Sequence, residues 1–281
     1  MIFSDLILND LSKKNLQNYL EKTTHALLLT GKSGVGLNTI AEVLAREIAN
    51  ANFIRIYPQL HKKQKAPNIN IDDIRELHEI TRSVRKDKIV IIIDEAEKMT
   101  HDAPQTLLKL LEEPAENVFY ILTSHLPEKL PKTIHSRSQK IEILPAKNSA
   151  EFILPNFTKL TNVKIAQIKF IAGNFPAEIH RLLANEEYFR DTAAKIETAK
   201  IFLQGNIAAR LKIISNVNNR EDAKELIANL ARLINLTMNR VSSEKLENVA
   251  QNLQILSAAT DNLSDNCNLR AQLTAVAINF Y

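Results

Sequence analysis

Two acidic residues follow directly after an apolar run in the middle of the chain. Ile89–Ile93 consists of β-branched residues throughout, and Asp94 and Glu95 come next. An apolar run without alternation is typical of a strand that is buried on both faces of a parallel sheet. At the carboxyl end of such a strand, a first acid could hold a magnesium ion and a second could orient a water for phosphoryl transfer. The alternative is that the two acids only make a surface loop soluble.

A glycine-rich stretch near the amino terminus forms a second candidate site. Its glycines are Gly31, Gly34 and Gly36. It separates an apolar run, Ala26–Thr30, from an amphipathic segment over residues 37–49. A strand, a glycine loop and a helix in this order are the context of a P-loop, in which loop amides and the helix dipole hold phosphate.

The side chains that a P-loop needs are missing at the end of this loop. The pattern G-x-x-x-x-G-K-[ST] requires a lysine and a hydroxyl residue after its last glycine. This chain has Leu37 and Asn38 at those two positions. Lys32 could still reach a phosphate from within the loop and supply the missing positive charge. We therefore predict a degenerate P-loop that binds nucleotide weakly or not at all.

The apolar pattern places both sites on alternating strands and helices. Strands are predicted over residues 26–30, 52–57, 89–93, 118–123 and 140–144. Helices are predicted over residues 4–22, with Ser4 as the cap, over 37–49, and from Ile71 onward. Residues 58–70 carry the basic run HKKQK and are predicted to form an exposed loop. This order of elements predicts an α/β fold with a parallel sheet.

Composition narrows the class of protein. With 45% hydrophobic residues among 281, the chain can build substantial cores, and no apolar stretch is long enough to span a membrane. A net charge of +4 gives no strong case for a dedicated nucleic-acid surface. Cys267 is the only cysteine, which excludes an intrachain disulfide and a cysteine-based zinc site, and we predict no metal site. The acidic amino terminus lacks the basic start of a signal peptide, so a cytoplasmic location is expected.

The carboxyl-terminal part of the chain is predicted to be helical throughout. No proline occurs after Pro176, and Gly205 is the only glycine in that region. Leucines at helical spacing, Leu226, Leu230 and Leu233, predict a wide apolar stripe. Such a stripe either forms the core of this region or faces a partner subunit.

Four short segments follow one another over the middle of the chain. They are DEAE at residues 94–97, LLKLLEEP at 107–114, FYILTS at 119–124 and LPKTIHSRSQ at 130–139. Their order resembles that of the clamp-loader subunits of bacterial DNA polymerase III, which are AAA+ ATPases. The resemblance implies an α/β AAA+ core with a parallel sheet, a small helical lid and an all-α C-terminal collar domain. The corresponding boundaries are residues 1–146, 147–191 and 192–281, and Asp94 and Glu95 would be the Walker B-like acids of the core.

The resemblance also assigns a role to Arg137, which together with Ser136 stands in the family's Ser-Arg motif. In that family the arginine reaches the γ-phosphate bound by the next subunit, as an arginine finger in trans. A guanidinium suits this role because it stays charged and presents a planar fork of donors to the transferred phosphoryl group. We expect Arg137 at the domain surface, after a proline-containing turn over residues 131–135. The alternative is a surface arginine without such a role.

Three departures from the family's pattern predict a subunit that is silent in its own site. Leu37 and Asn38 replace the P-loop lysine and hydroxyl, and Pro176 or Ala177 stands where the family's lid helix carries an arginine. The chain would then hold no cofactor, and ATP would be bound by neighbouring subunits. The resemblance implies tau or gamma and delta subunits as partners, with the sliding clamp and primer–template DNA reached through the complex. Two alternatives remain open: an active AAA+ motor subunit of the same complex, and a P-loop-derived scaffold outside replication.

Overall fold

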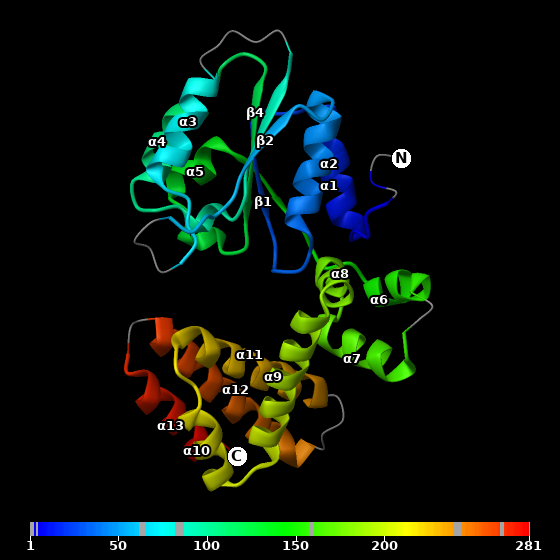
Figure 1. The fold of residues 1–281 in the computed structure, drawn as a ribbon, viewed down its shortest axis with the longest axis vertical. Helices are drawn as coiled ribbons and strands as arrows, with labels where there is room; N and C mark the ends of the chain where they lie inside the picture. Colours follow the sequence, from blue (N-terminus) through cyan, green and yellow to red (C-terminus); the bar gives the residue numbers. More distant parts are fainter. Residues whose placement is uncertain are drawn as a thin grey trace. The chain divides into compact units, whose positions relative to one another are not determined.

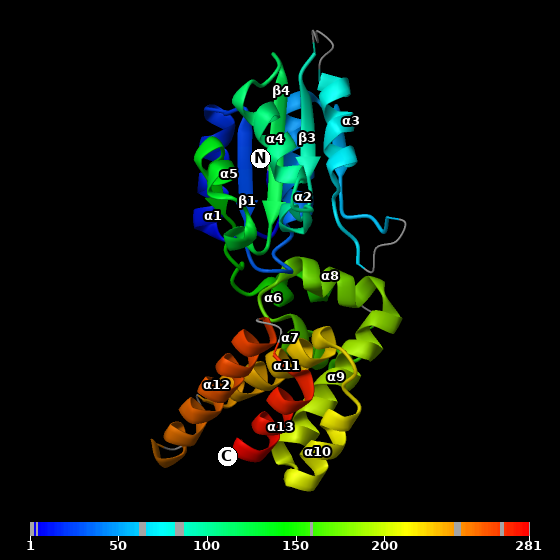
Figure 2. The same ribbon diagram turned by 90° about the vertical axis from the view of Figure 1, so that its left-hand side faces the viewer.

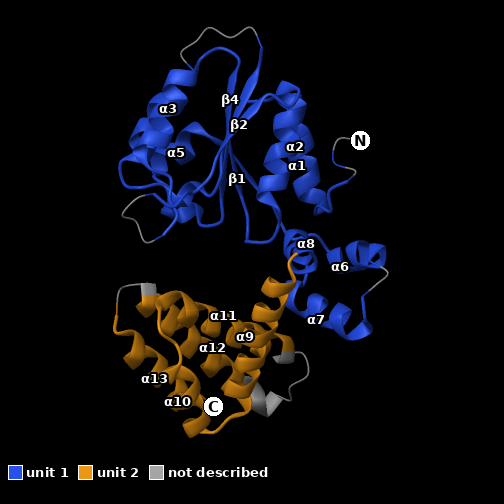
Figure 3. Cartoon of the chain, in the orientation of Figure 1, with its two compact units in different colours: residues 1–184 blue, residues 185–281 orange. Residues whose placement is uncertain are grey.

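The structure, a computed structural model, describes residue 3 and residues 5–61, 66–81, 87–157, 160–238, 243–264 and 267–280. The chain forms two compact units, residues 1–184 and 185–281, which Figure 3 draws in blue and orange. Most of the basic run predicted to lie in an exposed loop, at residues 62–65, falls outside the described residues. The finer division into a core, a lid and a collar stays a prediction.

Unit 1 is built on a sheet of parallel strands. The strands are β1 (Ala26–Thr30), β2 (Phe53–Ile56), β3 (Ile89–Ile93), β4 (Val118–Ser124) and β5 (Gln139–Glu142). Their order across the sheet is β2-β3-β4-β1-β5, and every neighbouring pair is parallel. All residues of β1 and β3 are buried, because helices cover both faces of the sheet (Figures 1 and 2). The predicted α/β fold class with a parallel sheet is confirmed.

Two sets of helices cover the two faces of this sheet (Figure 1). The first set is α1 (Asp10–Glu21) and α2 (Leu37–Ala49), and the second is α3 (Ile71–Thr81), α4 (Ala103–Glu112) and α5 (Lys132–Arg137). Leu27 and Leu29 of β1 pack in the core on the side of α1 and α2, whereas Ala26 and Leu28 pack on the other side. This alternation follows from the strand period of two residues, which sends neighbouring side chains to opposite faces.

The first helix begins later than the apolar pattern indicates. The prediction of a helix over residues 4–22 is wrong at its start, because α1 begins at Asp10 and is capped by Asn9, whose Oδ1 accepts a hydrogen bond from the Leu11 amide at 3.0 Å. Leu6 and Leu8, two residues apart, precede the helix and pack partly buried on the core. Their apolar character reflects that packing instead of a helical face. The expected cap, Ser4, lies outside the described residues.

A second correction concerns the segment before β5. The turn expected over residues 131–135 is the start of the short helix α5, which ends at Arg137. Pro131 precedes the helix, where its missing amide leaves no helical hydrogen bond unmade, and the buried Ile134 anchors the helix to the core. Arg137 therefore has the fixed backbone of a helix end.

The remaining elements are helical. Unit 1 continues with α6 (Ser149–Ile153), α7 (Asn162–Ala172) and α8 (Pro176–Ala184). Unit 2 contains α9 (Glu186–Gln204), α10 (Ile207–Ser215), α11 (Arg220–Met238), α12 (Ser243–Ser264) and α13 (Leu269–Asn279). Leu226, Leu230 and Leu233 are buried within unit 2, so this stripe belongs to its core. None of the described helices combines the length and the apolarity that crossing a bilayer requires.

Arginine side chains hold helix ends together inside unit 2. The guanidinium of the buried Arg210 donates to the carbonyl oxygens of Phe202, at 3.1 Å, and Phe280, at 2.7 Å. Arg220 donates to the carbonyl of Leu263 at 2.6 Å, and Arg270 donates to that of Ile214 at 3.0 Å. These acceptors lie in the last turns of helices or just beyond them, where carbonyl groups lack intrahelical partners and a positive charge is favoured.

Candidate nucleotide site and arginine finger

The glycine loop lies at the end of the sheet that is formed by the carboxyl ends of β1, β3 and β4. It joins β1 to α2, and both Gly34 and Gly36 have a φ of +92°, a conformation that side-chain-bearing residues rarely adopt. The loop is fastened at its start, because Nδ1 of His125 lies 2.8 Å from the carbonyl oxygen of Gly31. The backbone therefore has the strand–loop–helix arrangement of a P-loop.

The two residues after the glycines lack the charge and the hydroxyl with which a P-loop binds phosphate and magnesium. Leu37 is 1% exposed and belongs to the apolar core between the sheet and α2. Oδ1 of Asn38 is buried and has no hydrogen-bond partner among the described residues. Lys32 is exposed within the loop. Leu37 and Asn38 thus supply neither the ammonium nor the hydroxyl of a working P-loop.

Asp94 is held by a guanidinium from inside its own unit. Nη2 of Arg55, on β2, lies 2.8 Å from Oδ2 of Asp94, and the Asp94 side chain is only 5% exposed. The Thr123 hydroxyl, at the end of β4, donates to Oδ1 of Asp94 at 2.6 Å. Nη1 of the same arginine lies 2.7 Å from Oε1 of Glu42 on α2. Both oxygens of the carboxylate that would hold a divalent cation are therefore already bound.

Glu95 is also engaged. Its backbone has a φ of +48°, and its amide donates to the Thr123 hydroxyl at 3.0 Å. Its carboxylate forms an ion pair with Lys98, one turn further on. A different acid, Glu97, accepts a hydrogen bond from the His125 amide at 3.0 Å, so it links the ends of β3 and β4.

The start of α8 packs directly on the glycine loop. The Ala177 amide donates to the carbonyl oxygen of Gly34 at 3.0 Å. A Cβ atom built on Gly34 would lie 3.0 Å from that of Phe175 and 3.2 Å from that of Glu178. Pro176 and Ala177 occupy this contact, whereas Arg181 lies on the exposed side of α8. The hollow that remains between residues 5–8, the loop and α8 has a volume of about 190 Å³.

A magnesium–nucleotide complex does not fit these residues. Arg55 and Thr123 already satisfy the carboxylate of Asp94, and the buried Leu37 offers no charge to a phosphate. The adjacent hollow, about 190 Å³, is smaller than the roughly 300–1,000 Å³ of typical ligand pockets. The residues predicted from sequence, namely Gly31, Gly34, Gly36, Leu37, Asn38, Asp94 and Glu95, all lie at this edge of the sheet. The sequence analysis did not single out Arg55 and Thr123, although these two residues bind the Asp94 carboxylate at this site.

Arg137 and Ser136 lie near the amino-terminal ends of the strands, at the end of the sheet opposite the glycine loop. Arg137 ends α5 just before the amino end of β5, and Gln139 there pairs with Leu27 near the start of β1. Nη2 of Arg137 lies 2.6 Å from Oε1 of Glu112, with side chains 35% and 47% exposed, respectively. Its Nη1 donates to the carbonyl oxygen of Thr133 at 3.2 Å and to the Ser136 hydroxyl at 3.1 Å. Arg137 is therefore a partly exposed, oriented cation well separated from the glycine loop of its own unit.

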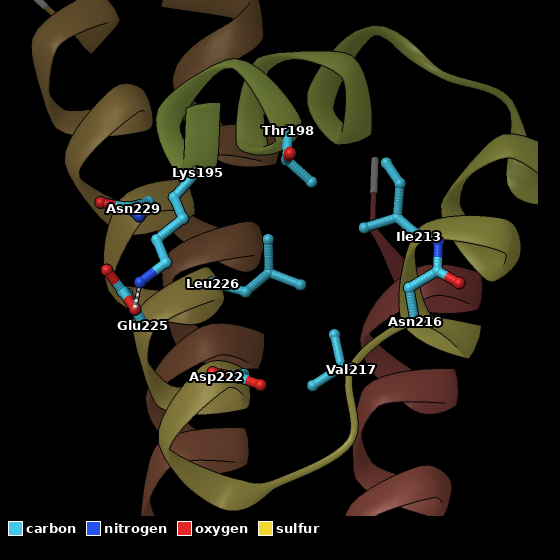
Figure 4. A pocket seen from close by; sticks show the side chains of 9 residues that line it. All are labelled: Lys195, Thr198, Ile213, Asn216, Val217, Asp222, Glu225, Leu226 and Asn229. Atoms are coloured by element: carbon cyan, nitrogen blue, oxygen red, sulfur yellow. Dashed lines mark ion pairs between the residues drawn. The ribbon is translucent and has the colours of Figure 1, made fainter. Parts of the chain in front are cut away.

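A further hollow lies inside unit 2, between α9, α10 and α11 (Figure 4). It has a volume of about 260 Å³ and mixes apolar residues such as Leu226 with charged ones. The ammonium of Lys195 lies 2.7 Å from Asp191 and 2.9 Å from Glu225. Hydrogen bonds to these carboxylates, first that of Asp191, raise the pKa of Lys195 above its usual range. The positive charge of Lys195 is thus already balanced by two carboxylates. Across both units, the described residues contain no group of three or more acids, histidines or cysteines that could hold a metal ion.

Comparisons with known proteins place this geometry in a family context. A family model described as DNA polymerase III, delta subunit, matches residues 46–147. Subunit tau of DNA polymerase III from Bacillus subtilis is 26% identical over 188 residues, covering 59% of this chain and 33% of the relative. Subunit gamma from Buchnera aphidicola is 31% identical over 154 residues, covering 48% and 43%. Subunit delta' from Haemophilus influenzae is 26% identical over 134 residues, covering 41% of each.

A solved structure shows the fold. The RuvB Holliday junction branch migration motor of Thermotoga maritima superimposes with a TM-score of 0.51 at 15% identity, covering 72% of this chain and 80% of that one. The parallel sheet, the glycine loop and this likeness define the chain as a protein with the AAA+ fold. The family match and the relatives support the clamp-loader family within that class. The chain spans less than half the length of each of these relatives.

Proposed function

We propose that this chain is the delta-prime subunit of the bacterial DNA polymerase III clamp loader. It does not hydrolyse ATP in its own site and supplies Arg137 in trans to the ATP site of a neighbouring subunit. The observation that carries this proposal is the ion pair of Arg55 with Asp94, in which a guanidinium holds the carboxylate that a motor subunit would use for magnesium. The occluded loop and the apolar Leu37 support the same conclusion.

The proposed partners follow from this role. A finger at the amino ends of the strands, opposite the glycine loop, cannot serve its own unit's site, and a partly exposed guanidinium suits a γ-phosphate presented by another subunit. The tau or gamma subunits would bind the ATP, and the delta subunit would complete the complex. The sliding clamp and primer–template DNA would be reached through that complex, in the cytoplasm. The chain itself would hold neither ATP nor zinc.

A second candidate is an active motor subunit of tau or gamma type. It is favoured by the names of two relatives, subunits tau and gamma, which match more of this chain than the delta' relative does. The two candidates differ in what Asp94 does. In a motor subunit it would hold magnesium, whereas in the proposed subunit it holds Arg55.

Asp94→Asn is expected to leave the ATPase rate of a reconstituted clamp loader at the wild-type level. The substitution removes the charge needed for magnesium but keeps an oxygen that can accept from Thr123, so the free energy of unfolding should fall by only about 1–2 kcal/mol. Titration of the isolated wild-type chain with magnesium-ATP should show no saturable binding. An assembled Asp94→Asn complex with strongly reduced turnover, or tight nucleotide binding by the isolated chain, would favour the motor subunit instead.

Arg137→Ala is expected to lower the ATPase rate of the assembled complex while the isolated chain stays folded. An arginine finger is worth about 10³–10⁵ in rate at the site it serves, but the measured loss will be partial because other sites keep their own fingers. The Michaelis constant for ATP should change less than turnover, since the charge acts mainly in the transition state. Arg137→Lys should restore only part of the rate, because an ammonium lacks the planar fork. A complex that assembles and hydrolyses normally with Arg137→Ala would remove the trans-acting role.

A further inference from the structure

The guanidinium of Arg137 contacts three groups that belong to unit 1, the same unit as Arg137 itself. They are the Glu112 carboxylate at the end of α4, 2.6 Å from Nη2, and the Thr133 carbonyl and Ser136 hydroxyl, which accept from Nη1 at 3.2 and 3.1 Å. We call these three groups the arginine cradle. Both terminal nitrogens of the guanidinium are bound by it, so the plane of the fork is fixed as well as its position.

Only one member of the cradle carries charge. Thr133 and Ser136 lie on the same short helix as Arg137, whereas Glu112 reaches it from α4. Ion pairs with side chains as exposed as these contribute little to folding stability. A carboxylate at the end of a helix is also unfavourable with respect to the helix dipole. Stability of the fold therefore gives a poor reason for a glutamate at this position, and the orientation of Arg137 gives a better one.

We propose that Glu112 is the positioning residue of the arginine finger. This inference rests on the proposed function, and it adds that the finger is oriented before a neighbouring nucleotide arrives. A long arginine side chain loses much rotamer freedom when it is fixed on a phosphate. In this chain the cradle fixes the side chain in advance, so less freedom is lost at the moment of reaction. Glu112 does not touch the phosphoryl group and acts only through Arg137.

The neighbouring Glu113 provides a matched control. It follows Glu112 in the chain, lines the same hollow of about 420 Å³ between the ends of α3 and α4, and forms no ion pair with another described residue. Glu112→Gln and Glu113→Gln therefore make the same change of charge on the same surface. Only the first of them removes the ionic partner of Arg137.

The test uses the reconstituted clamp loader with four versions of this chain: Glu112→Gln, Glu113→Gln, Arg137→Ala and the double variant Glu112→Gln/Arg137→Ala. Glu112→Gln should lower turnover at the site served by the finger about 3- to 10-fold, with little change in the Michaelis constant for ATP. Glu113→Gln should match the wild-type complex. The double variant should be no slower than Arg137→Ala alone, because Glu112 has nothing to position once the arginine is gone.

Each failure points to a different error. If Arg137→Ala slows the complex and Glu112→Gln does not, the positioning role is wrong and the proposed function stands. If Glu112→Gln slows the Arg137→Ala complex further, Glu112 acts independently of the arginine, which also overturns the inference. If Arg137→Ala has no effect, the finger itself is wrong and the inference falls with it. Nitrogen-15 NMR of the isolated chain gives a second measurement: rotation of the Arg137 guanidinium should be slow in the wild type and Glu113→Gln, and fast in Glu112→Gln. Fast rotation in all three would overturn the cradle.

Discussion

Arg210→Ala is expected to lower the free energy of unfolding of unit 2 by about 3–5 kcal/mol. The side chain is 9% exposed and packs against the rings of both Phe202 and Phe280, with its guanidinium carbon 5.7 and 5.5 Å from their centroids. Truncation removes hydrogen bonds to three helix-end carbonyls, those of Phe202, Ala277 and Phe280. It also removes the packing of the guanidinium against two aromatic rings, so several losses coincide.

Hydrogen exchange measured by mass spectrometry can locate this effect. Peptides from α9, α10 and α13 should lose protection in Arg210→Ala, whereas peptides from the sheet of unit 1 should keep theirs. Arg210→Lys keeps the charge but not the fork, so an intermediate loss is expected. Arg190→Ala is the matched control and should cost less than about 0.5 kcal/mol, because within the described part of the chain this exposed arginine has one ion pair, a long one with Glu186 at 3.5 Å. Equal losses for Arg190→Ala and Arg210→Ala would show that the buried guanidinium has no special role.

Asp94→Ala is expected to destabilise unit 1 by about 2–3 kcal/mol. The substitution removes the charged partner of Arg55 and the acceptor of the Thr123 hydroxyl at once. The loss stays below that of a fully buried ion pair, because the Arg55 side chain is 32% exposed and keeps Glu42 as a second partner. Denaturant unfolding followed by exchange of peptides from β2, β3 and β4 measures it.

A double-mutant cycle with Arg55→Ala separates the ion pair from the other contacts of Asp94. The coupling energy between Arg55 and Asp94 should be about 1–2 kcal/mol, within the range for contacting residues. Glu42→Ala removes the second carboxylate that binds Arg55. The Glu42 side chain is 34% exposed, so its loss should cost less than about 1 kcal/mol. No coupling between Arg55 and Asp94 would mean that the guanidinium does not stabilise the acid.

The strands and the glycine loop could be predicted from the sequence because each depends on residues that are adjacent in the chain. A run such as Ile89–Ile93 can be stabilised only by burial on both faces, and Gly34 and Gly36 mark a backbone that needs a positive φ. The start of α1 could not be placed in this way. Leu8 and Leu11 lie three residues apart, as on a helix, whereas Leu6 and Leu8 lie two apart, as in an extended segment, and the cap at Asn9 decides where the helix begins.

The character of the site was hidden because its deciding contact joins distant residues. Arg55 lies 39 positions before Asp94, and nothing in either local pattern pairs them. One signal was present: an arginine inside the apolar run NFIRIY, where a charge is rarely tolerated without a partner. The contact between Glu112 and Arg137 was missed for the same reason, since it depends on where two helices end in space.

If the chain is catalytically silent as proposed, the guanidinium that Arg55 places on Asp94 would also make a loss of catalysis hard to reverse. A lysine at position 37 alone would put a charge into the apolar core that now holds Leu37. Removing Arg55 alone would leave Asp94, 5% exposed, without its cationic partner. Under the proposed function, each of these single substitutions would therefore cost stability without restoring turnover. Several changes would have to arrive together, so under the proposed function the Arg55–Asp94 ion pair would keep the chain dependent on nucleotides bound by neighbouring subunits.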